Sequence, residues 1–325
     1  MEERPLGTTA LPVSRIGLGL AAVGRPAYIN LGREEDLAGD RDVDALRRRS
    51  HELLDAAMAA GIRYVDVARS YGLAESYLGS WLEARGPGAV VPTIGSKWGY
   101  RYVGGWRLDA PVHEVKDHSL AAFRRQLEES RAILDGHLSL YQVHSATLES
   151  GILDDHAVLR ALGDLAAEGV AVGLTVSGPR QADVVRRALD VRIDGRNPFA
   201  SVQATWNVLE TSVEPALIDA HDSGWGVIVK EAVANGRLAR LEAAPPVVAS
   251  IAARHAVGPD AVAIAAVIAR PWADVVLSGA ASVGQLESNL AALSVALSPD
   301  ELNELARHAE AADDYWAERS HLAWS

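Results

Sequence analysis

Short runs rich in valine and isoleucine alternate along the chain with longer stretches in which apolar residues recur at helical spacing. Eight of these runs are apolar at nearly every position. Such runs are typical of parallel strands that are covered on both faces. The expected strands are residues 15–21, 63–67, 90–96, 138–144, 171–176, 201–205, 226–229 and 274–278.

The intervening stretches predict the helices that connect these strands. They include residues 43–60, 74–84, 115–134, 155–167, 180–189, 214–223 and 259–269. Eight strand–helix units favour a closed barrel over an open doubly wound sheet. The predicted fold is therefore α/β, a (β/α)8 TIM barrel. No linker divides the chain, so residues 1–325 are expected to form a single domain.

Three segments lie outside the eight repeats. Residues 1–14 predict a short β-hairpin with its turn at Gly7, which would close the floor of the barrel. A polar insertion, 25–42, follows the first strand at a place where active-site loops occur. The extension 295–325 has Ser298 three residues before a glutamate, the spacing of a helix capping box, and ends in an aromatic stretch. It predicts a C-terminal helical and aromatic tail.

The composition narrows the classes of function. Hydrophobic residues make up 49% of the chain, and with two Phe and two Met the core must rest mainly on Ala, Val, Leu and Ile. A formal net charge of −12 without a basic stretch argues against nucleic acid as a partner. The chain contains no cysteine, which excludes disulfides and thiolate metal sites and is compatible with a reducing compartment.

The N-terminal stretch shows no basic segment followed by an apolar one. No apolar run reaches the ~18 residues that a membrane-spanning helix needs. We therefore expect a soluble, cytoplasmic protein with no membrane partner.

Four polar residues are placed so that each could stand at the carboxyl end of a strand: Asp66, Tyr71, Lys97 and His144. Reactive groups of such barrels come from this end. A phenol with an ordinary pKa near ~10 is a poor acid at neutral pH, and a nearby ammonium lowers its pKa. Asp66 can pair with Lys97, and His144 can bind a substrate oxygen. The set predicts protonation of an oxygen while its carbon gains hydride.

Each of the four residues has a commoner explanation when it is taken alone. An Asp after a strand usually caps a turn, a Tyr belongs to the core or rim, a Lys is a solvated charge and a His is structural. Their joint occurrence on consecutive strand–helix units favours chemistry over these explanations.

Four motifs resemble those of the aldo-keto reductase family: GIRYVDVARSYGLAE, GSKWG, DGHLSLYQVH and VQATWNVLE. The resemblance extends from LGTTALPVSRIGLG to the region of Asn289. It implies a (β/α)8 barrel that binds a nicotinamide dinucleotide across its mouth, and no G-x-G-x-x-G follows a predicted strand. It also implies that Tyr71 protonates a carbonyl oxygen, that Lys97 paired with Asp66 lowers the tyrosine pKa, and that His144 orients the carbonyl.

The resemblance assigns further residues to the nicotinamide end of the cofactor. Gly19 lies at the expected barrel mouth. Ser177 and Gln203 match positions that bind the nicotinamide carboxamide, whereas Gly178 replaces the asparagine that is usual in the family. A structural alternative for Ser177 is that it caps the following helix.

The seventh strand departs from the family pattern. Lys230 stands where the family commonly has an aromatic residue that stacks on the nicotinamide, and Glu231 stands where a serine follows. An ammonium cannot stack and would repel an oxidised, cationic nicotinamide, so Lys230 must point elsewhere or pair with Glu231. The alternatives are an ordinary ion pair at the rim, an altered cofactor geometry, or a lysine in the substrate pocket.

The segment after the eighth strand resembles the family's adenosine-phosphate loop. Gly279 and the backbone amides that follow form an expected phosphate cradle, Gln285 lies on its exposed face, and Asn289 matches an adenine-contacting asparagine. The family favours NADP(H). Residues 280–285 contain no Lys or Arg to pair a ribose 2′-phosphate, so NAD(H) is the alternative cofactor.

Aromatic residues cluster around the expected barrel mouth. Trp98, Trp106 and Trp316 are predicted to line a substrate pocket, because aromatic walls suit planar or sugar-like ligands. The alternative is that they simply close the mouth. His113 and His118 do not have the spacing of a metal triad, so no metal is expected.

These observations lead to one main hypothesis, NAD(P)H-dependent reduction of an aldehyde or ketone with Tyr71 as general acid. One alternative is a NAD-dependent sugar 1-dehydrogenase, which the uncharged phosphate loop motivates. Another is a cofactor-binding regulatory subunit with little turnover. The presence of the complete tetrad, Asp66, Tyr71, Lys97 and His144, argues against it. The expected partner is a small carbonyl or sugar substrate, and the oligomeric state is left open.

Overall fold

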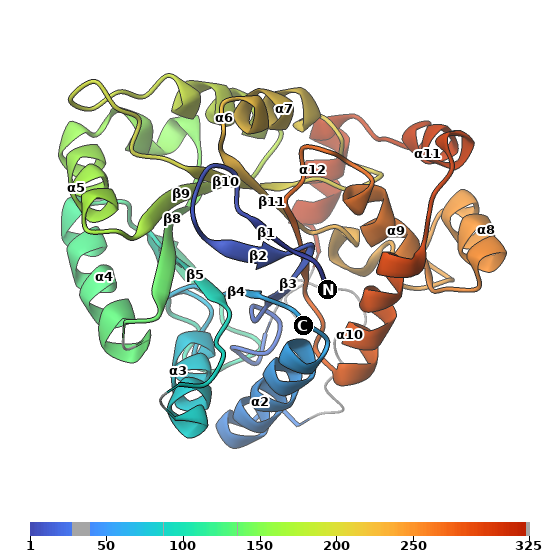
Figure 1. The fold of residues 1–325 in the computed structure, drawn as a ribbon, viewed down its shortest axis with the longest axis horizontal. Coiled ribbons are helices and arrows are strands. Elements are labelled where there is room, and N and C mark those ends of the chain that lie inside the picture. Colours follow the sequence, from blue (N-terminus) through green and yellow to red (C-terminus); the bar gives the residue numbers. More distant parts are fainter. Residues whose placement is uncertain (28–39, 87, 135, 323–325) are drawn as a thin grey trace.

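The computed structural model describes residues 1–27, 40–86, 88–134 and 136–322. Eight parallel strands pair in chain order and close into a barrel, with the last strand bonded to the first (Figure 1). The ring consists of β3 (Ile16–Gly19), β4 (Tyr64–Asp66), β5 (Thr93–Trp98), β8 (Leu138–Ala146), β9 (Ala171–Val176), β10 (Ser201–Thr205), β11 (Gly226–Lys230) and β12 (Val275–Ser278). The predicted (β/α)8 fold is confirmed.

Helices surround the ring (Figure 1). Those in the described ranges are α2 (Val43–Ala59), α3 (Ala74–Arg85), α4 (Leu120–Leu134), α5 (His156–Ala167), α6 (Gln181–Leu189), α7 (Glu214–Asp222), α8 (Pro246–His255), α9 (Pro259–Ile268), α10 (Val283–Leu290), α11 (Pro299–Ala306) and α12 (Ala312–Ser320). Within these ranges no single helix is long and apolar enough to cross a membrane. Only α8 and α9 taken together reach that length, and they are bent by 89°.

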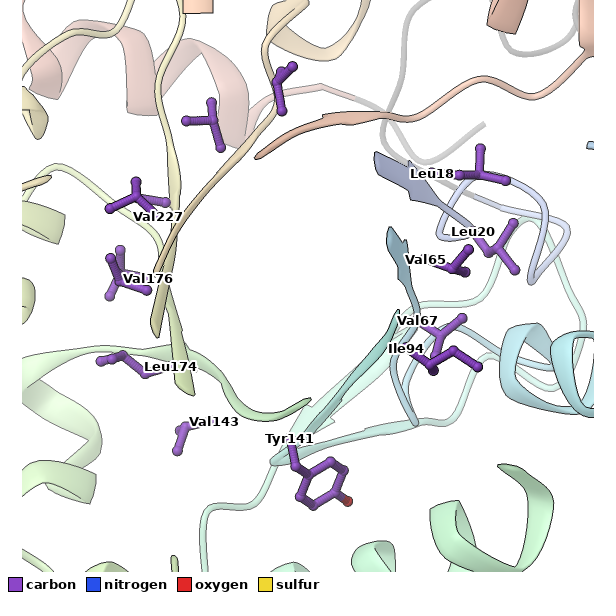
Figure 2. Close-up of a cluster of buried hydrophobic side chains, with 14 of the residues drawn as sticks. Leu18, Leu20, Val65, Val67, Ile94, Tyr141, Val143, Leu174, Val176 and Val227 are labelled. Carbon is purple, nitrogen blue, oxygen red and sulfur yellow. The ribbon is translucent and has the colours of Figure 1, made fainter. Parts of the chain in front are cut away.

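Strand side chains alternate between the helix layer and the interior of the ring. Figure 2 shows Leu18, Val65 and Ile94 outside the ring of strands, where they belong to the main hydrophobic core. Successive side chains of a strand point to opposite faces. Asp66, next to Val65, therefore points into the ring, and so does Lys97, three residues after Ile94. The alternation that builds the core also brings these two charged residues together.

The predicted N-terminal hairpin is confirmed. Strands β1 (Glu3–Pro5) and β2 (Pro12–Ser14) pair antiparallel and lie across the centre of the barrel in Figure 1. Leu6 and Val13 are buried and pack with interior-facing residues of several barrel strands. Gly7, in the turn, has φ +52. The hairpin closes the end of the barrel opposite to the carboxyl ends of the strands.

We expect Gly7→Ala to destabilise the protein more than Gly151→Ala. Both glycines have positive φ, which costs a residue with a Cβ about 1 kcal/mol. At Gly7 a Cβ would also lie 2.3 Å from the backbone nitrogen of Gly226, whereas at Gly151 it would meet no described residue within 4 Å apart from the chain neighbours. Overpacking of this kind costs about 1–3 kcal/mol more. Urea unfolding measures both losses, and equal losses would contradict the close approach of the hairpin to the barrel.

The region after β5 corrects the sequence prediction of a helix over 115–134. The helix α4 begins at Leu120, and β7 (Glu114–Lys116) instead pairs antiparallel with β6 (Tyr100–Tyr102). The start is fixed by Ser119, whose hydroxyl accepts a hydrogen bond from a backbone N–H in the first turn at 3.2 Å. The residues before it are therefore available for a hairpin that follows the carboxyl end of β5.

The C-terminal extension 295–325 forms two helices, α11 and α12. The predicted capping box at Ser298 is confirmed at the start of α11. Helix α12 is anchored by Tyr315, whose hydroxyl accepts a hydrogen bond from Asn207 Nδ2 at 3.0 Å. Most of the predicted insertion 25–42 lies outside the described residues.

Candidate active site

Lys97 and Asp66 form the expected pair inside the barrel. Lys97 comes from β5 and is fully buried; its Nζ forms a salt bridge with Asp66 Oδ1 and donates to the backbone oxygen of Val67 at 2.9 Å. The same Nζ lies 4.7 Å from the centre of the Tyr71 ring. A buried ammonium needs such partners, because desolvation without them costs several kcal/mol.

The second oxygen of Asp66 is also occupied. Gln203 Nε2 donates to Oδ2 at 2.9 Å, and the Tyr64 hydroxyl lies 3.2 Å from the same atom. Asp66 itself is almost completely buried. The carboxylate therefore fixes the position of Lys97 and joins β4, β5 and β10 at one point.

Tyr71 follows β4 and lines the cavity above the barrel. Burial is the main cause that raises the pKa of Tyr71 well above the ordinary value of 10.0. The carboxylates of Asp66 and Glu114 raise it further, whereas the guanidinium of Arg25 lowers it. That Lys97 lowers this pKa stays a prediction; in the structure, burial and the two carboxylates outweigh the guanidinium of Arg25. The phenol is held in its protonated form, which is the form that acts as an acid.

His144, near the end of β8, is held neutral. Burial is the main cause that lowers its pKa well below 6.5, and the ammonium groups of Lys97 and Lys230 lower it further. Its Nδ1 lies 3.3 Å from Ser70 Oγ, and its ring meets Tyr71 edge-on with 5.5 Å between centroids. A neutral imidazole can donate a hydrogen bond to an oxygen without adding charge.

Sequence reasoning missed Arg25 and Glu114. Arg25 is buried, and its Nη1 donates to Glu114 Oε1 at 2.7 Å and to the backbone oxygen of Ser70 at 2.8 Å. Its guanidinium carbon lies 5.6 Å from the centre of the Tyr71 ring. Because Glu114 belongs to β7, this pair ties the β6–β7 hairpin to the turn that carries Tyr71. The sequence analysis expected a helix from residue 115 onward, so it did not place Glu114 on a strand beside the site.

A cavity of about 580 Å³ lies at the carboxyl ends of the strands, and Asp66, Tyr71 and His144 line it. Its volume is within the usual range for small-molecule sites. The residues that the sequence assigns to a cofactor share this cavity: Gly19, Ser177, Gln203, Lys230, Gly279, Gln285 and Asn289. The candidate cofactor residues and the tetrad therefore surround one space.

Trp98, Trp106 and Trp316, which the sequence predicts to line a substrate pocket, are not among the described residues that line this cavity. Trp98 is fully buried and packs edge-on against Phe123 at 5.0 Å. Trp106 donates its Nε1 to a backbone oxygen at 3.1 Å. Trp316 packs in the hydrophobic cluster under α12. For Trp98 the reason is strand alternation, since Lys97 points inward.

The cavity wall near His144 is mostly polar instead. It is lined by Tyr100, Lys116, Ser145 and Thr147. The Tyr100 and His144 rings are 5.1 Å apart, and Lys116 Nζ donates to the backbone oxygen of Ser145 at 3.2 Å. In the described part of the chain, no group of three or more His, Asp or Glu side chains could hold a metal ion.

Lys230 points into the cavity and is partnered there. Its Nζ donates to Thr205 Oγ1 at 2.8 Å and to Ser177 Oγ at 3.1 Å, and lies 3.8 Å from Glu231 Oε1. Glu231 accepts two hydrogen bonds from Arg319 of α12. Lys230 thus pairs with Glu231, as one reading of the sequence expected, without leaving the cavity.

The loop after β12 forms the other end of the cavity. Apart from the chain neighbours of Gly279, no atom of the described residues lies within 4 Å of the position that a Cβ would take there, so the backbone is open toward the described part of the chain. Gln285 Oε1 accepts a backbone N–H of this loop at 2.8 Å. Asn289 bonds to Ser278 and Asp260, both at 2.7 Å, while it lines the cavity.

Comparison with known proteins identifies the family. The model of the aldo/keto reductase family matches residues 39–310. The uncharacterized oxidoreductase YqkF of Bacillus subtilis is 24% identical over 98% of this chain and 100% of its own length. An aryl-alcohol dehydrogenase [NADP(+)] of Phanerodontia chrysosporium is 26% identical, and that match spans 53% of this chain and 45% of the dehydrogenase.

The fold comparison agrees. The holo form of the aldo-keto reductase AKR11C1 from Bacillus halodurans superposes with a TM-score of 0.71, at 24% identity, over 96% of this chain and 97% of that one. The chain belongs to the aldo/keto reductase family. By this membership it is an NAD(P)-dependent oxidoreductase that acts on alcohol or carbonyl groups.

Proposed function

We propose that this protein reduces the carbonyl group of an aldehyde or ketone to an alcohol with NAD(P)H. The observation that carries the proposal is the convergence of Asp66, Lys97, Tyr71 and His144 around one cavity. Reduction adds a hydride to the carbonyl carbon and a proton to its oxygen. It therefore needs an acid beside the oxygen and room for the nicotinamide beside the carbon.

The residues of the tetrad have different roles in protonating and orienting the carbonyl oxygen. Tyr71 donates its phenolic proton, and burial keeps that proton in place until it is needed. The ammonium of Lys97, 4.7 Å from the ring centre, then stabilises the phenolate that remains. The neutral His144 donates a hydrogen bond that orients the carbonyl oxygen.

The residues present fit a nicotinamide dinucleotide, which supplies the hydride when it is bound. Ser177 and Gln203 offer polar groups near the tetrad, and the open backbone at Gly279 offers room for a phosphate. Residues 280–285 offer no basic side chain, but Arg240 lines the same cavity, and we expect it to pair with a ribose 2′-phosphate. NADP(H) is therefore our expected cofactor, and the Michaelis constants for NADPH and NADH with one aldehyde test this choice.

A second candidate is oxidation of a free sugar at its anomeric carbon. The polar wall formed by Lys116, Ser145 and Thr147 favours it, because such groups can bind sugar hydroxyls. The same tetrad would then act in reverse, with Tyr71 accepting the proton. Reduction of an aldehyde panel with NADPH, compared with oxidation of a panel of aldoses with NAD⁺ and NADP⁺, separates the two candidates.

Cofactor binding without turnover in either panel would favour the regulatory alternative. The absorbance of the reduced nicotinamide reports turnover, and quenching of tryptophan fluorescence by the cofactor reports binding. We expect turnover with aldehydes.

A further inference from the structure

The chain contains three lysines, and all of them lie at the candidate active site. Lys97 pairs with Asp66, whereas Lys116 and Lys230 line the cavity. All other cationic side chains except histidine are arginines. A lysine ammonium is more compact than a guanidinium and, unlike it, can lose its proton. The roles proposed for the tetrad account for Lys97 but not for Lys230.

Lys230 places a positive charge at the wall of the cavity. Its hydrogen-bond partners, Ser177 and Thr205, are neutral hydroxyls. The carboxylate of Glu231 is shared with Arg319, which binds it through two hydrogen bonds. The remaining pair in the barrel, Asp66 with Lys97, is internally balanced, and His144 is neutral. Lys230 therefore adds a positive charge that Glu231 balances only in part, because Glu231 also pairs with Arg319.

This charge acts where the reaction takes place. Lys230 is one of the cations that lower the pKa of His144, which shows that its field reaches the tetrad. For hydride transfer, the nicotinamide must lie within reach of a carbonyl held by Tyr71 and His144. Lys230 lines the same cavity as both residues, so its ammonium faces the space in which the ring must lie.

We infer that Lys230 makes the site discriminate between the two oxidation states of the cofactor, so that the neutral, reduced nicotinamide binds more tightly than the cationic, oxidised one. This inference rests on the proposed function. In carbonyl reduction the hydride carries two electrons from the ring to the carbonyl carbon and leaves the ring with one positive charge, while the phenolic proton goes to the oxygen. The oxidised product is then repelled by Lys230 and leaves readily.

The size of the effect follows from Coulomb's law. Unit charges about 10 Å apart at an effective dielectric constant of about 20 change a binding equilibrium by about tenfold. Both oxidation states carry the same phosphates. The ratio of their dissociation constants therefore isolates the charge of the ring from all other contacts of the cofactor.

The discrimination is expected to depend on pH. Burial lowers the pKa of Lys230 to about 8, while Glu231 raises it and Arg319 and Lys97 lower it. Burial alone would raise the pKa of Glu231, but Arg319 and Lys230 lower it to about 2. Glu231 therefore stays charged over the whole pH range of this titration. Lys230 is therefore charged below about pH 8 and neutral above it, so the preference for the reduced form should fall as pH rises.

The test is a pair of fluorescence titrations with NADPH and NADP⁺ at about pH 7. We expect the ratio of the NADP⁺ to the NADPH dissociation constant to fall about tenfold in Lys230→Met. Lys116→Met is the matched control, since it removes an identical charge from another wall of the cavity, and its ratio should stay near the wild-type value. An unchanged ratio in Lys230→Met, or an equal change in both variants, overturns the inference.

A measurement on the wild-type protein covers the case in which Lys230→Met does not fold. Acetylation with limiting acetic anhydride, followed by peptide mass spectrometry, reports each of the three lysines separately. Labelling of Lys230 should rise as pH passes through about 8, and the NADP⁺ to NADPH ratio of the wild type should fall over the same range. A ratio independent of pH overturns the inference alone. Failure of both cofactor forms to bind would instead overturn the proposed function as well.

Discussion

Tyr71→Phe is expected to lower kcat/KM for carbonyl reduction by about a thousandfold, because general acid catalysis contributes roughly 10²–10⁴-fold. The substitution removes the hydroxyl and keeps the ring, so the edge-on contact with His144 at 5.5 Å is preserved. Cofactor affinity should change little. Steady-state kinetics with an aldehyde, together with a fluorescence titration of NADPH, measure both quantities.

The matched control for this variant is Tyr77→Phe. Tyr77 is also a buried tyrosine, but it lies on α3 and is not among the described residues that line the cavity. Its loss of a hydroxyl should leave turnover unchanged. If Tyr71→Phe retained turnover within a factor of a few, Tyr71 would not be the acid.

Asp66→Asn is expected to affect both stability and turnover. It leaves the fully buried ammonium of Lys97 without its carboxylate, and breaking a buried ion pair in this way costs about 3–5 kcal/mol. It also releases Lys97 from its place 4.7 Å from the centre of the Tyr71 ring, so turnover should be almost lost. Urea unfolding and kinetics on the same preparation measure the two effects.

The double variant Asp66→Asn/Lys97→Met separates the two effects. Removing both charges restores much of the stability, because replacing a whole buried pair with uncharged groups is often nearly neutral. It does not restore the ammonium beside Tyr71. We therefore expect a double variant that is more stable than Asp66→Asn alone and still inactive. Recovery of wild-type turnover would contradict the role of the pair.

The barrel could be predicted from the sequence because its strands are largely apolar and its helices have clear periodicity. Strand ends could be predicted only to within a few residues. The third strand was expected over 90–96, yet β5 spans Thr93–Trp98. This difference places both Lys97 and Trp98 inside the strand, where successive side chains point to opposite faces. Because Lys97 points into the ring, Trp98 must point into the helix layer.

The tetrad could be predicted because its members lie near or just after the carboxyl ends of consecutive barrel strands, where short segments fix their positions. Two other features depend on contacts between distant parts of the chain. Arg25 binds Glu114, and Arg319 of the last helix binds Glu231 beside Lys230. The raised pKa of Tyr71 has the same origin, because its main cause is burial and no local motif reports burial.

The most direct test of the account is a single-turnover reaction with an aldehyde and reduced cofactor that carries deuterium at the transferable position. The wild-type protein should consume the cofactor with a primary isotope effect and place deuterium on the carbinol carbon of the alcohol. Tyr71→Phe, loaded with the same cofactor, should show almost no transfer. Cofactor that binds to the wild-type protein while no deuterium reaches any aldehyde of a broad panel would contradict the account.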